Sequence, residues 1–297
     1  MDELIRKLEQ YIEASGDSQS ATAKKIGISP TALSQLLKGK YPNPQTLEKK
    51  ITEFLDISEQ ESQIIKRPEF VMTSISKTVL DTISYCHIQK AIGLVYGDAG
   101  IGKSEAVKQY EREYSEAIVI RVSKAFTREK SLLKILARKL RVAENKKIED
   151  LYMDCIERLD GSGKLLIIDE AQRLPHSTIE LLRDLHDDAQ VGVVFIGNHQ
   201  VYSKMHGKGE AAFAQIFSRV GIRKCVLTSH VKIEDIQMLF PEYDEEKEAE
   251  LKVLHQIAQT KWGIRGAVNL YTNACNNGDT SYKGIVGMAK YMGIGSN

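Results

Sequence analysis

One eight-residue segment constrains this chain more than any other feature: Gly97-Asp98-Ala99-Gly100-Ile101-Gly102-Lys103-Ser104. An apolar run at residues 92–96 precedes it, and a helix-like run at residues 105–110 follows it. This order of strand, glycine-rich loop and helix is typical of a phosphate-binding loop, because glycines let backbone N–H groups converge on phosphate oxygens at a helix N-terminus. Lys103 would reach the outer phosphates, and the Ser104 hydroxyl would ligate Mg²⁺. The segment therefore predicts that these eight residues bind a nucleotide.

The composition is that of an ordinary water-soluble chain of 297 residues, long enough for about two domains. Charged residues make up 27% and the formal net charge is +1, so the global charge does not indicate a nucleic-acid partner. The four cysteines include no C-x-x-C pair and are typical of reduced thiols. The N-terminus is unlike a signal peptide, and the apolar runs are far shorter than the roughly 20 residues of a membrane helix. We therefore expect a cytoplasmic protein with no membrane partner.

The spacing of apolar residues divides the chain into four parts. We expect a helical domain at residues 1–66, a linker at 67–90, an α/β core at 91–230, and a helical lid with a tail at 231–297. In the core, helical runs alternate with strand-like runs at residues 92–96, 117–122, 164–168, 191–197 and 223–227. This alternation predicts a parallel sheet flanked by helices. The expected fold class is an α/β parallel sheet with a small lid, preceded by an all-α domain.

Residues 19–55 resemble the helix-turn-helix domain of phage repressors. The resemblance lies in residues 23–29 and 32–39, where Gly27 permits a tight turn and Ser29 caps the next helix. It implies that residues 30–38 form the recognition helix, which in this fold class enters the DNA major groove. The residues that would face base edges or phosphates are Thr31, Ser34, Gln35 and Lys38. The alternative is a small helical bundle that contacts protein.

Two adjacent carboxylates, Asp169 and Glu170, end the apolar run at residues 165–168. Parallel sheets place their ligand sites at the carboxyl ends of buried strands. Phosphoryl transfer needs a metal clamp and a group that positions water. We therefore expect Asp169 to hold Mg²⁺ through water and Glu170 to polarise the attacking water. Without the phosphate-binding loop in the same chain, we would interpret this pair as a strand end followed by an acid that caps a helix.

Residues 88–276 resemble the AAA+ family of ATPases. Residues 97–104 match its Walker A motif, and residues 167–170 match its Walker B motif. The resemblance implies ATP hydrolysis, with Asn198 as the sensor-1 amide, Arg265 as sensor 2, and Arg219 as an arginine finger for the neighbouring subunit. A guanidinium from outside stabilises transition-state charge and makes hydrolysis depend on assembly. Arg223 is an alternative candidate for the arginine finger. Without the other motifs, each of these arginines would be interpreted as part of a surface ion pair.

The strongest charge bias lies between the second and third strand-like runs. Residues 121–147 hold ten basic side chains against only Glu129 and Glu144. Such clustering is typical of polyanion binding. In an AAA+ assembly the loop at residues 123–128 would lie at the inner rim, and the residues expected to contact DNA phosphates are Lys124, Thr127, Arg128 and Lys130. The alternative is an amphipathic helix with a solvated basic face.

A repressor-like domain before a compact AAA+ module resembles the phage Mu transposition protein B family of ATP-dependent target-DNA activators. The resemblance implies an ATP-bound homo-oligomer, a helical filament on double-stranded DNA, that recruits and stimulates a DDE transposase. A helicase loader or replication initiator shares every nucleotide motif and stays an alternative. Two others are a transcriptional regulator with an ATPase switch and a scaffold that does not hydrolyse ATP.

Overall fold

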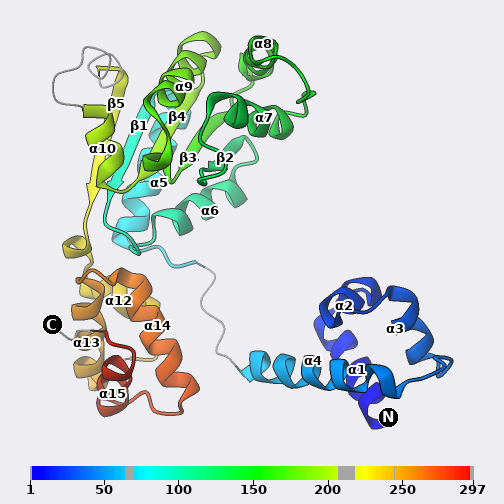
Figure 1. Ribbon diagram of the computed structural model, residues 1–297. Helices are drawn as coiled ribbons and strands as arrows, with labels where there is room; N and C mark the ends of the chain where they lie inside the picture. Colours follow the sequence, from blue (N-terminus) through cyan, green and yellow to red (C-terminus); the bar gives the residue numbers. More distant parts are fainter. Residues whose placement is uncertain (1, 64–69, 207–217, 244, 295–297) are drawn as a thin grey trace. The chain divides into compact units, whose positions relative to one another are not determined.

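The computed structural model describes residues 2–63, 70–206, 218–243 and 245–294. The chain divides into two compact units, Met1–Lys66 and Arg67–Asn297 (Figure 1). Within the described ranges, no helix is both long enough and apolar enough to cross a membrane.

The described part of the first unit is helical. Its helices are α1 (Asp2–Ser15), α2 (Gln19–Ile26), α3 (Pro30–Leu37) and α4 (Gln45–Gln63). The turn between α2 and α3 forms as predicted, because Gly27 adopts a φ of 76° and the Ser29 side chain accepts a hydrogen bond from Ala32 N. A small core holds the helices together; its buried residues are Leu8, Ala23, Ile26, Leu33, Leu36, Leu47 and Ile51. The α2–turn–α3 corner is a helix-turn-helix.

The second unit is built on a five-stranded parallel sheet with the strand order β2-β3-β4-β1-β5. The strands are β1 (Ile92–Gly97), β2 (Ala117–Arg121), β3 (Leu165–Asp169), β4 (Gly192–Gly197) and β5 (Val220–Val226). The predicted α/β fold class is confirmed. The edge strand β5 begins before the predicted run at 223–227, since its mostly exposed side chains give a weak apolar signal. Because all strands run in one direction, their carboxyl ends meet at one edge of the sheet.

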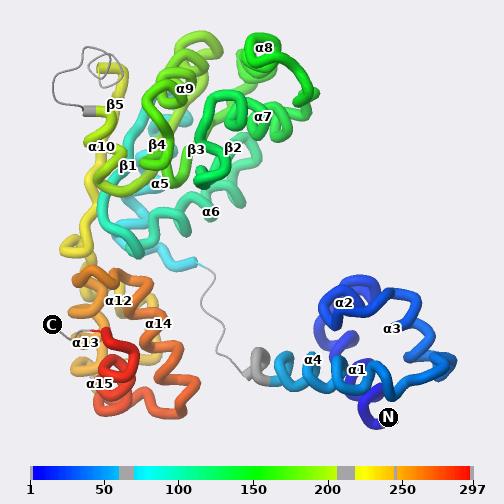
Figure 2. The backbone as a smooth tube through the Cα atoms, in the orientation of Figure 1, coloured from blue at the N-terminus to red at the C-terminus, as the bar shows by residue number. Residues whose placement is uncertain are grey.

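Helices cover both faces of this sheet. Alternate strand residues belong to two separate apolar clusters, with Val95 and Ile167 in one and Leu94 and Ile168 in the other. Helices α5 (Ser74–Gln89) and α6 (Lys103–Glu113) complete the first cluster. The second is completed by α7 (Glu129–Lys139), α8 (Ile148–Leu159), α9 (His176–Ala189) and α10 (His199–His206), whose paths can be followed in Figure 2.

Helix α5 corrects the predicted linker at residues 67–90. Ile75, Val79 and Ile83 recur at helical spacing and are buried against the sheet, so residues 74–89 belong to the second unit. The carboxylate of Asp235 holds the N-terminus of α5, accepting hydrogen bonds from Ser74 N and Ser74 Oγ, both at 2.6 Å. The many Ser and Thr residues of this segment led to the prediction of a connector. The apolar residues between them, Ile75, Val79 and Ile83, form one face of the helix and pack it against the sheet.

A helical lid follows the sheet. Its elements are η2 (Thr228–His230), α12 (Ile233–Leu239), η3 (Glu245–Lys247), α13 (Glu248–Ala258), α14 (Gly263–Asn276) and α15 (Tyr282–Tyr291). Helix α14 begins directly against the glycine-rich loop. Gly263 has a φ of 62°, and a Cβ there would lie 2.8 Å from Gly100 O. Only glycine permits this approach, so the start of α14 is fixed over the loop.

Candidate active site

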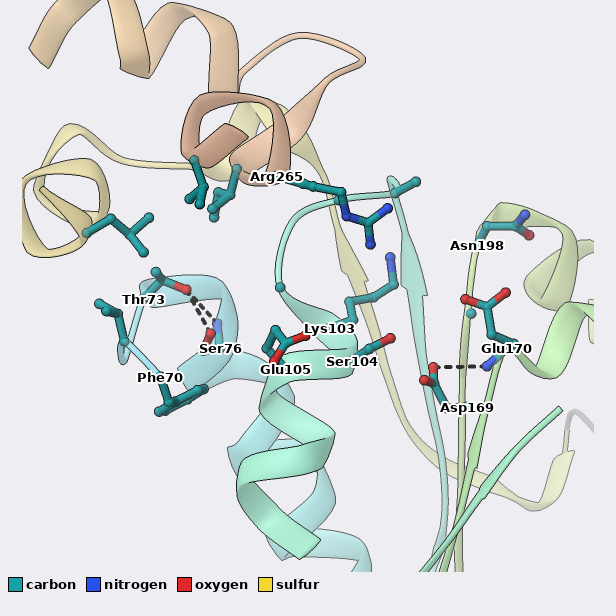
Figure 3. A pocket seen from close by; sticks show the side chains of 18 of the residues that line it. Phe70, Thr73, Ser76, Lys103, Ser104, Glu105, Asp169, Glu170, Asn198 and Arg265 are labelled. Carbon is teal, nitrogen blue, oxygen red and sulfur yellow. Dashed lines mark hydrogen bonds between the residues drawn. The ribbon is translucent and has the colours of Figure 1, made fainter. Parts of the chain in front are cut away.

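A cavity of about 580 Å³ lies between the carboxyl edge of the sheet, the glycine-rich loop and the lid. Residues from four separate segments line its polar end (Figure 3): Ala99, Gly100, Gly102, Lys103, Ser104, Asp169, Glu170, Asn198 and Arg265. The structure thus brings together the predicted lysine, metal ligands, water-positioning acid, sensor-1 amide and sensor-2 arginine. The volume lies in the range of small-molecule sites.

Two glycines shape the loop that joins β1 to α6. Gly102, with a φ of 99°, directly precedes Lys103, the first residue of α6. At Gly97, with a φ of 147°, a Cβ would lie 1.7 Å from Val226 O of β5, so no side chain fits. Gly97 and Ile101, both predicted to bind the nucleotide, do not line the cavity. Ile101 is instead buried in the apolar core, where it holds the loop against the rest of the unit.

The Lys103 ammonium lies over this loop. Its Nζ donates hydrogen bonds to Gly97 O at 3.1 Å and to Asp98 O. Burial lowers the pKa of Lys103, and the charges of Asp169 and Asp98 partly oppose that shift. The α6 N-terminus adds partial positive charge at the same place. Together the ammonium and the helix N-terminus make this end of the cavity suited to a phosphate chain.

Asp169 and Ser104 provide adjacent oxygen ligands. Asp169 is 5% exposed, and burial raises its pKa, while a hydrogen bond from the Ser104 hydroxyl opposes the shift. A hydroxyl and a carboxylate are hard oxygen donors of the kind that Mg²⁺ prefers. The described residues contain no group of three or more His, Cys, Asp or Glu able to hold a metal ion. A hydroxyl beside a carboxylate fits two positions of a Mg²⁺ site, and phosphate oxygens and water would supply the others.

Glu170 is held in an unusual conformation. Its φ of 62° is left-handed, which costs free energy for a residue with a Cβ and commonly marks functional sites. The Glu170 carboxylate Oε2 accepts a hydrogen bond from Gln172 Nε2 at 2.9 Å and lies 3.1 Å from the Arg173 guanidinium. Both partners lie in η1 (Ala171–Arg173), directly after β3. No sequence pattern singled out Gln172 or Arg173.

Asn198 follows β4 and is fixed on two sides. Its backbone N donates a hydrogen bond to Gln172 Oε1 at 3.3 Å, and its Oδ1 accepts one from Gln200 N at 2.9 Å. Since Oδ1 caps the start of α10, the amide NH₂ is the group that Asn198 offers to a phosphate or water in the cavity. Gln172 therefore connects Glu170 with Asn198.

Arg265 reaches the cavity from the lid. Its backbone N donates a hydrogen bond to Gly100 O at 2.8 Å, which ties the first turn of α14 to the glycine-rich loop. Its side chain extends toward Lys103 (Figure 3). Two cations at the same end of the cavity repel each other, and the charge of Arg265 contributes to the lowered pKa of Lys103. An anion between them would relieve that repulsion.

The other end of the cavity is apolar, and the sequence did not predict it. The apolar residues that line it are Phe70, Val71, Leu239, Ile264 and Val268, and the polar residues Thr73 and Ser76 lie beside Phe70 (Figure 3). They come from the segment before α5, from α12 and from α14. A flat apolar group such as a purine base is suited to this end, while its phosphates extend to the polar end.

Comparison with known proteins identifies similar domains and relatives. A helix-turn-helix model matches residues 8–62, and an AAA-domain model matches residues 87–205. The Mu-like prophage FluMu DNA transposition protein B of Haemophilus influenzae is 29% identical over 281 residues, which cover 93% of this chain and 96% of that protein. The ATP-dependent target DNA activator B of Escherichia phage Mu is 27% identical over 256 residues, which cover 84% of this chain and 81% of that protein. The chain is thus similar over most of its length to relatives named Mu transposition protein B or target DNA activator B. Its second unit is an AAA+ ATPase.

Among solved structures, domain III of the Thermotoga maritima replication initiation protein DnaA matches with a TM-score of 0.47 and 15% identity. The match covers 75% of this chain and 94% of that chain. A likeness of this degree carries no functional argument.

Arg219, the predicted arginine finger, is not in the cavity of its own chain. Its guanidinium lies 3.5 Å from Asp187 Oδ1 of α9, and 59% of its side chain is exposed. The rival Arg223 lies on β5 and is also exposed. Neither residue lines the cavity.

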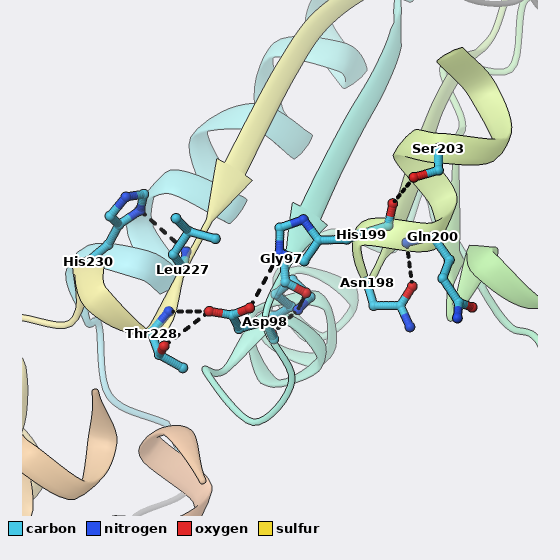
Figure 4. A network of polar contacts seen from close by, with 10 residues as sticks. Gly97, Asp98, Asn198, His199, Gln200, Ser203, Leu227, Thr228 and His230 are labelled. Atoms are coloured by element: carbon cyan, nitrogen blue, oxygen red, sulfur yellow. Dashed lines mark hydrogen bonds and ion pairs between the residues drawn. The ribbon is translucent and has the colours of Figure 1, made fainter. Parts of the chain in front are cut away.

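The loop residue Asp98 holds three segments together instead of lining the cavity (Figure 4). Its Oδ2 accepts hydrogen bonds from Thr228 N at 2.8 Å and Thr228 Oγ1 at 3.1 Å, while its Oδ1 lies 3.3 Å from His199 Nε2. Burial alone would raise the pKa of Asp98, but the hydrogen bonds from Thr228 and His199 outweigh it and lower that pKa. Asp98 was predicted to bind the nucleotide, whereas its carboxylate links the loop to α10 and to the start of the lid.

The residues predicted to bind DNA lie on two surfaces. In the second unit Lys124, Arg128 and Lys130 are exposed, while the backbone O of Thr127 accepts a hydrogen bond from Thr178 Oγ1 at 2.8 Å. Helix α7 buries Leu132, Leu133, Leu136 and Ala137, so it is amphipathic as the alternative interpretation also required. In the first unit Thr31, Gln35 and Lys38 are exposed and Ser34 is half-buried.

Proposed function

We propose that this protein is an ATP-dependent DNA-binding protein that assembles on double-stranded target DNA and there recruits and stimulates a DDE transposase in the bacterial cytoplasm. The observation that carries the proposal is the cavity at the sheet edge, where Lys103, Asp169, Glu170, Asn198 and Arg265 converge from separate segments. The DNA target is supported by the helix-turn-helix match and by relatives named ATP-dependent target DNA activator B.

The predicted catalytic residues in the cavity have distinct roles in hydrolysis. The loop amides and Lys103 hold the phosphates, and Glu170 orients the water that attacks the γ-phosphate. Asn198 and Arg265 contact the γ-phosphate, so the lid senses whether it is present. Ser104 and Asp169 would hold Mg²⁺, which supplies positive charge to the β- and γ-phosphates when bound.

Assembly completes the site. Because Arg219 is exposed and lies outside its own cavity, it is available to the cavity of a neighbouring subunit. Hydrolysis then depends on a homo-oligomer, for which we propose a helical filament around DNA. Lys124, Thr127, Arg128 and Lys130 contact phosphates along its inner side, and the recognition helix α3 adds contacts through Thr31, Ser34, Gln35 and Lys38. Phosphate-dominated binding weakens steeply with salt and varies little with sequence.

Electron microscopy on duplex DNA tests the proposal. With ATP and Mg²⁺, the parent protein and Glu170→Gln form filaments, since Glu170→Gln binds ATP without hydrolysing it. Lys103→Ala, which lacks the phosphate-binding ammonium, forms none. Filaments of Lys103→Ala as frequent as those of the parent, or no assembly by Glu170→Gln, would contradict the proposal.

Alanine substitutions test whether Arg219 or Arg223 is the arginine finger. Arg219→Ala binds ATP like the parent but loses DNA-stimulated hydrolysis by on the order of 10³-fold, the size of an arginine-finger effect. Arg223→Ala serves as the matched control and keeps its activity. A fully active Arg219→Ala eliminates the finger role, and a loss confined to Arg223→Ala transfers that role to Arg223.

A further inference from the structure

Every polar group of Asp98 has a partner. Its backbone N donates a hydrogen bond to Val226 O at 3.0 Å, and its backbone O accepts one from Lys103 Nζ. In the carboxylate, Oδ2 accepts hydrogen bonds from Thr228, and Oδ1 faces His199 Nε2 at 3.3 Å (Figure 4). An ionised carboxylate only accepts hydrogen bonds, so the imidazole Nε2 is the donor in that last contact. The two oxygens of one side chain therefore hold two different elements.

Through Oδ2, Asp98 fixes the point at which the lid begins. Thr228, the first residue of η2, donates to Oδ2 from its backbone N at 2.8 Å and from its hydroxyl at 3.1 Å. The residue after η2 is held to the lid in turn, because Val231 O accepts hydrogen bonds from His255 Nε2 at 2.9 Å and from Gln259 Nε2 at 3.1 Å, at the end of α13. Helix α14 follows, and its side chains line the apolar end of the cavity. The position of Thr228 therefore determines where the lid lies over the cavity.

Through Oδ1, Asp98 fixes the start of α10. His199 is the first residue of that helix and directly follows Asn198, the amide expected to contact the γ-phosphate. The His199 ring also packs edge-on against the Tyr96 ring, with centroids 5.8 Å apart, so the imidazole is held on two sides. Because adjacent residues share a backbone, the position of His199 determines where the Asn198 amide lies.

We propose that Asp98 is a positioning residue for ATP hydrolysis whose two carboxylate oxygens act on separate steps: Oδ2 sets the affinity for ATP through the lid, and Oδ1 sets the rate of turnover through α10. The turnover half rests on the role proposed above for Asn198. The affinity half rests on the contacts of η2 with the loop and with α13. Neither half requires DNA or a transposase.

ATP binding by isothermal titration and steady-state hydrolysis, both without DNA, test the inference on single variants. Thr228→Val removes the hydroxyl donor to Oδ2 and raises the Kd for ATP about five- to tenfold, as the loss of one hydrogen bond predicts. Its kcat stays within about twofold of the parent, since the catalytic groups are unchanged. Thr228→Ser keeps the hydroxyl and restores the Kd.

His199→Phe tests the other oxygen, because phenylalanine keeps a ring against Tyr96 and removes the donor to Oδ1. Half of the His199 side chain is exposed, so the contact is a modest one. We expect kcat to fall about three- to fivefold, as the loss of an exposed pair predicts. The Kd for ATP stays within about twofold, since the lid keeps its contact with Oδ2.

Asp98→Ala removes both oxygens and shows both effects. In double variants, Thr228→Val adds no further loss of affinity to Asp98→Ala, and His199→Phe adds no further loss of kcat. Thr272→Val is the matched control and keeps both constants, because the Thr272 hydroxyl donates to Val268 O within α14 and the residue does not line the cavity. General damage to the fold changes affinity and turnover together, so a split between them is specific to this network.

An unchanged Kd in Thr228→Val, or a raised Kd that Thr228→Ser does not restore, overturns the affinity half. An unchanged kcat in His199→Phe overturns the turnover half, and a change of both constants in each variant overturns their separation. Asn198→Ala distinguishes these failures from failure of the proposed function. If Asn198→Ala keeps the parent kcat, the role proposed for Asn198 fails and the turnover half fails with it, while the Kd of Thr228→Val still decides the affinity half.

Discussion

The two ends of the ATPase cavity differ in how they are built. The polar end collects charged and amide groups that follow the carboxyl ends of β1, β3 and β4, together with Arg265 from α14 of the lid. The apolar end collects Phe70, Leu239 and Val268 from segments that belong to no recognisable motif. We infer that the polar end performs chemistry and that the apolar end supplies binding. Variants at the two ends should therefore change different kinetic constants.

The largest effect is expected at the polar end. Glu170→Gln removes the water-positioning carboxylate and lowers kcat by about 10²–10⁴-fold, the usual contribution of a general base. The Kd for ATP stays within about threefold, since the amide has the same size. Glu113→Gln, at an exposed glutamate of α6, is the control and keeps its kcat. If both kcat and ATP affinity of Glu170→Gln match the parent, Glu170 has no role in the chemistry.

Gly263 affects both ends of the cavity, because it begins α14, the helix that carries Arg265 of the polar end and Val268 of the apolar end. In Gly263→Ala the Cβ meets Gly100 O at 2.8 Å and Ala99 O at 2.9 Å, in a left-handed conformation that costs roughly 1–3 kcal/mol. We expect ATP affinity to fall by about tenfold or more and kcat to fall with it, as the lid shifts.

Gly287→Ala is the matched control, since Gly287 lies in α15 and a Cβ there meets nothing within 4 Å. Isothermal titration and steady-state rates measure both variants. Parent-like ATP affinity in Gly263→Ala would show that lid contact with the loop does not contribute to binding.

A smaller effect is expected at the apolar end. Phe70→Ala removes an aromatic wall of the cavity and weakens ATP binding by about tenfold, equivalent to about 1.4 kcal/mol. At saturating ATP its kcat stays within about twofold of the parent. Phe126→Ala, at an exposed phenylalanine outside the cavity, leaves ATP affinity unchanged in the absence of DNA. A drop in kcat with unchanged affinity would reverse the proposed division between the two ends.

The smallest effect on ATP turnover comes from the first unit. Leu33 is fully buried in its small core, and Leu33→Ala costs about 3–5 kcal/mol of unfolding free energy in that unit. ATP hydrolysis without DNA stays within about twofold, because the residues that line the cavity in the described part of the chain all belong to the second unit. Thermal unfolding followed by circular dichroism, paired with a rate measurement, checks both statements. A proportional loss of ATPase activity would contradict the independence of the two units.

The sequence was sufficient where the function lies in contiguous residues. Residues 97–104 specify the loop because their glycines are required by local backbone geometry, and Gly27 with Ser29 specifies the helix-turn-helix corner for the same reason. Four strands of the sheet also followed from the sequence, since β1 to β4 are mostly buried apolar runs of the right length, whereas the start of the exposed edge strand β5 was not predicted. The DNA contacts and Arg219 stay predictions, because they depend on molecules outside this chain.

Other features depend on packing between distant segments. Phe70 and Leu239 are ordinary apolar residues until α5 and α12 bring them together, so no local pattern marks them. The roles of Gln172 and Arg173 cannot be inferred from the sequence, because they depend on contacts that η1 makes with the Glu170 side chain in the folded chain. Asp98 belongs to the predicted loop, yet its carboxylate accepts a hydrogen bond from Thr228 and contacts His199. Spacing in the sequence shows which residues are neighbours on one element and does not show which elements meet.

The central claim is that ATP in this cavity controls binding to DNA. Fluorescence anisotropy with a labelled duplex at fixed salt, with and without ATP and Mg²⁺, measures this coupling directly. The parent protein should bind DNA about 5–150-fold more tightly with ATP, the usual range for coupled sites, and Lys103→Ala should show no difference. Equal DNA affinity of the parent with and without ATP would contradict the account.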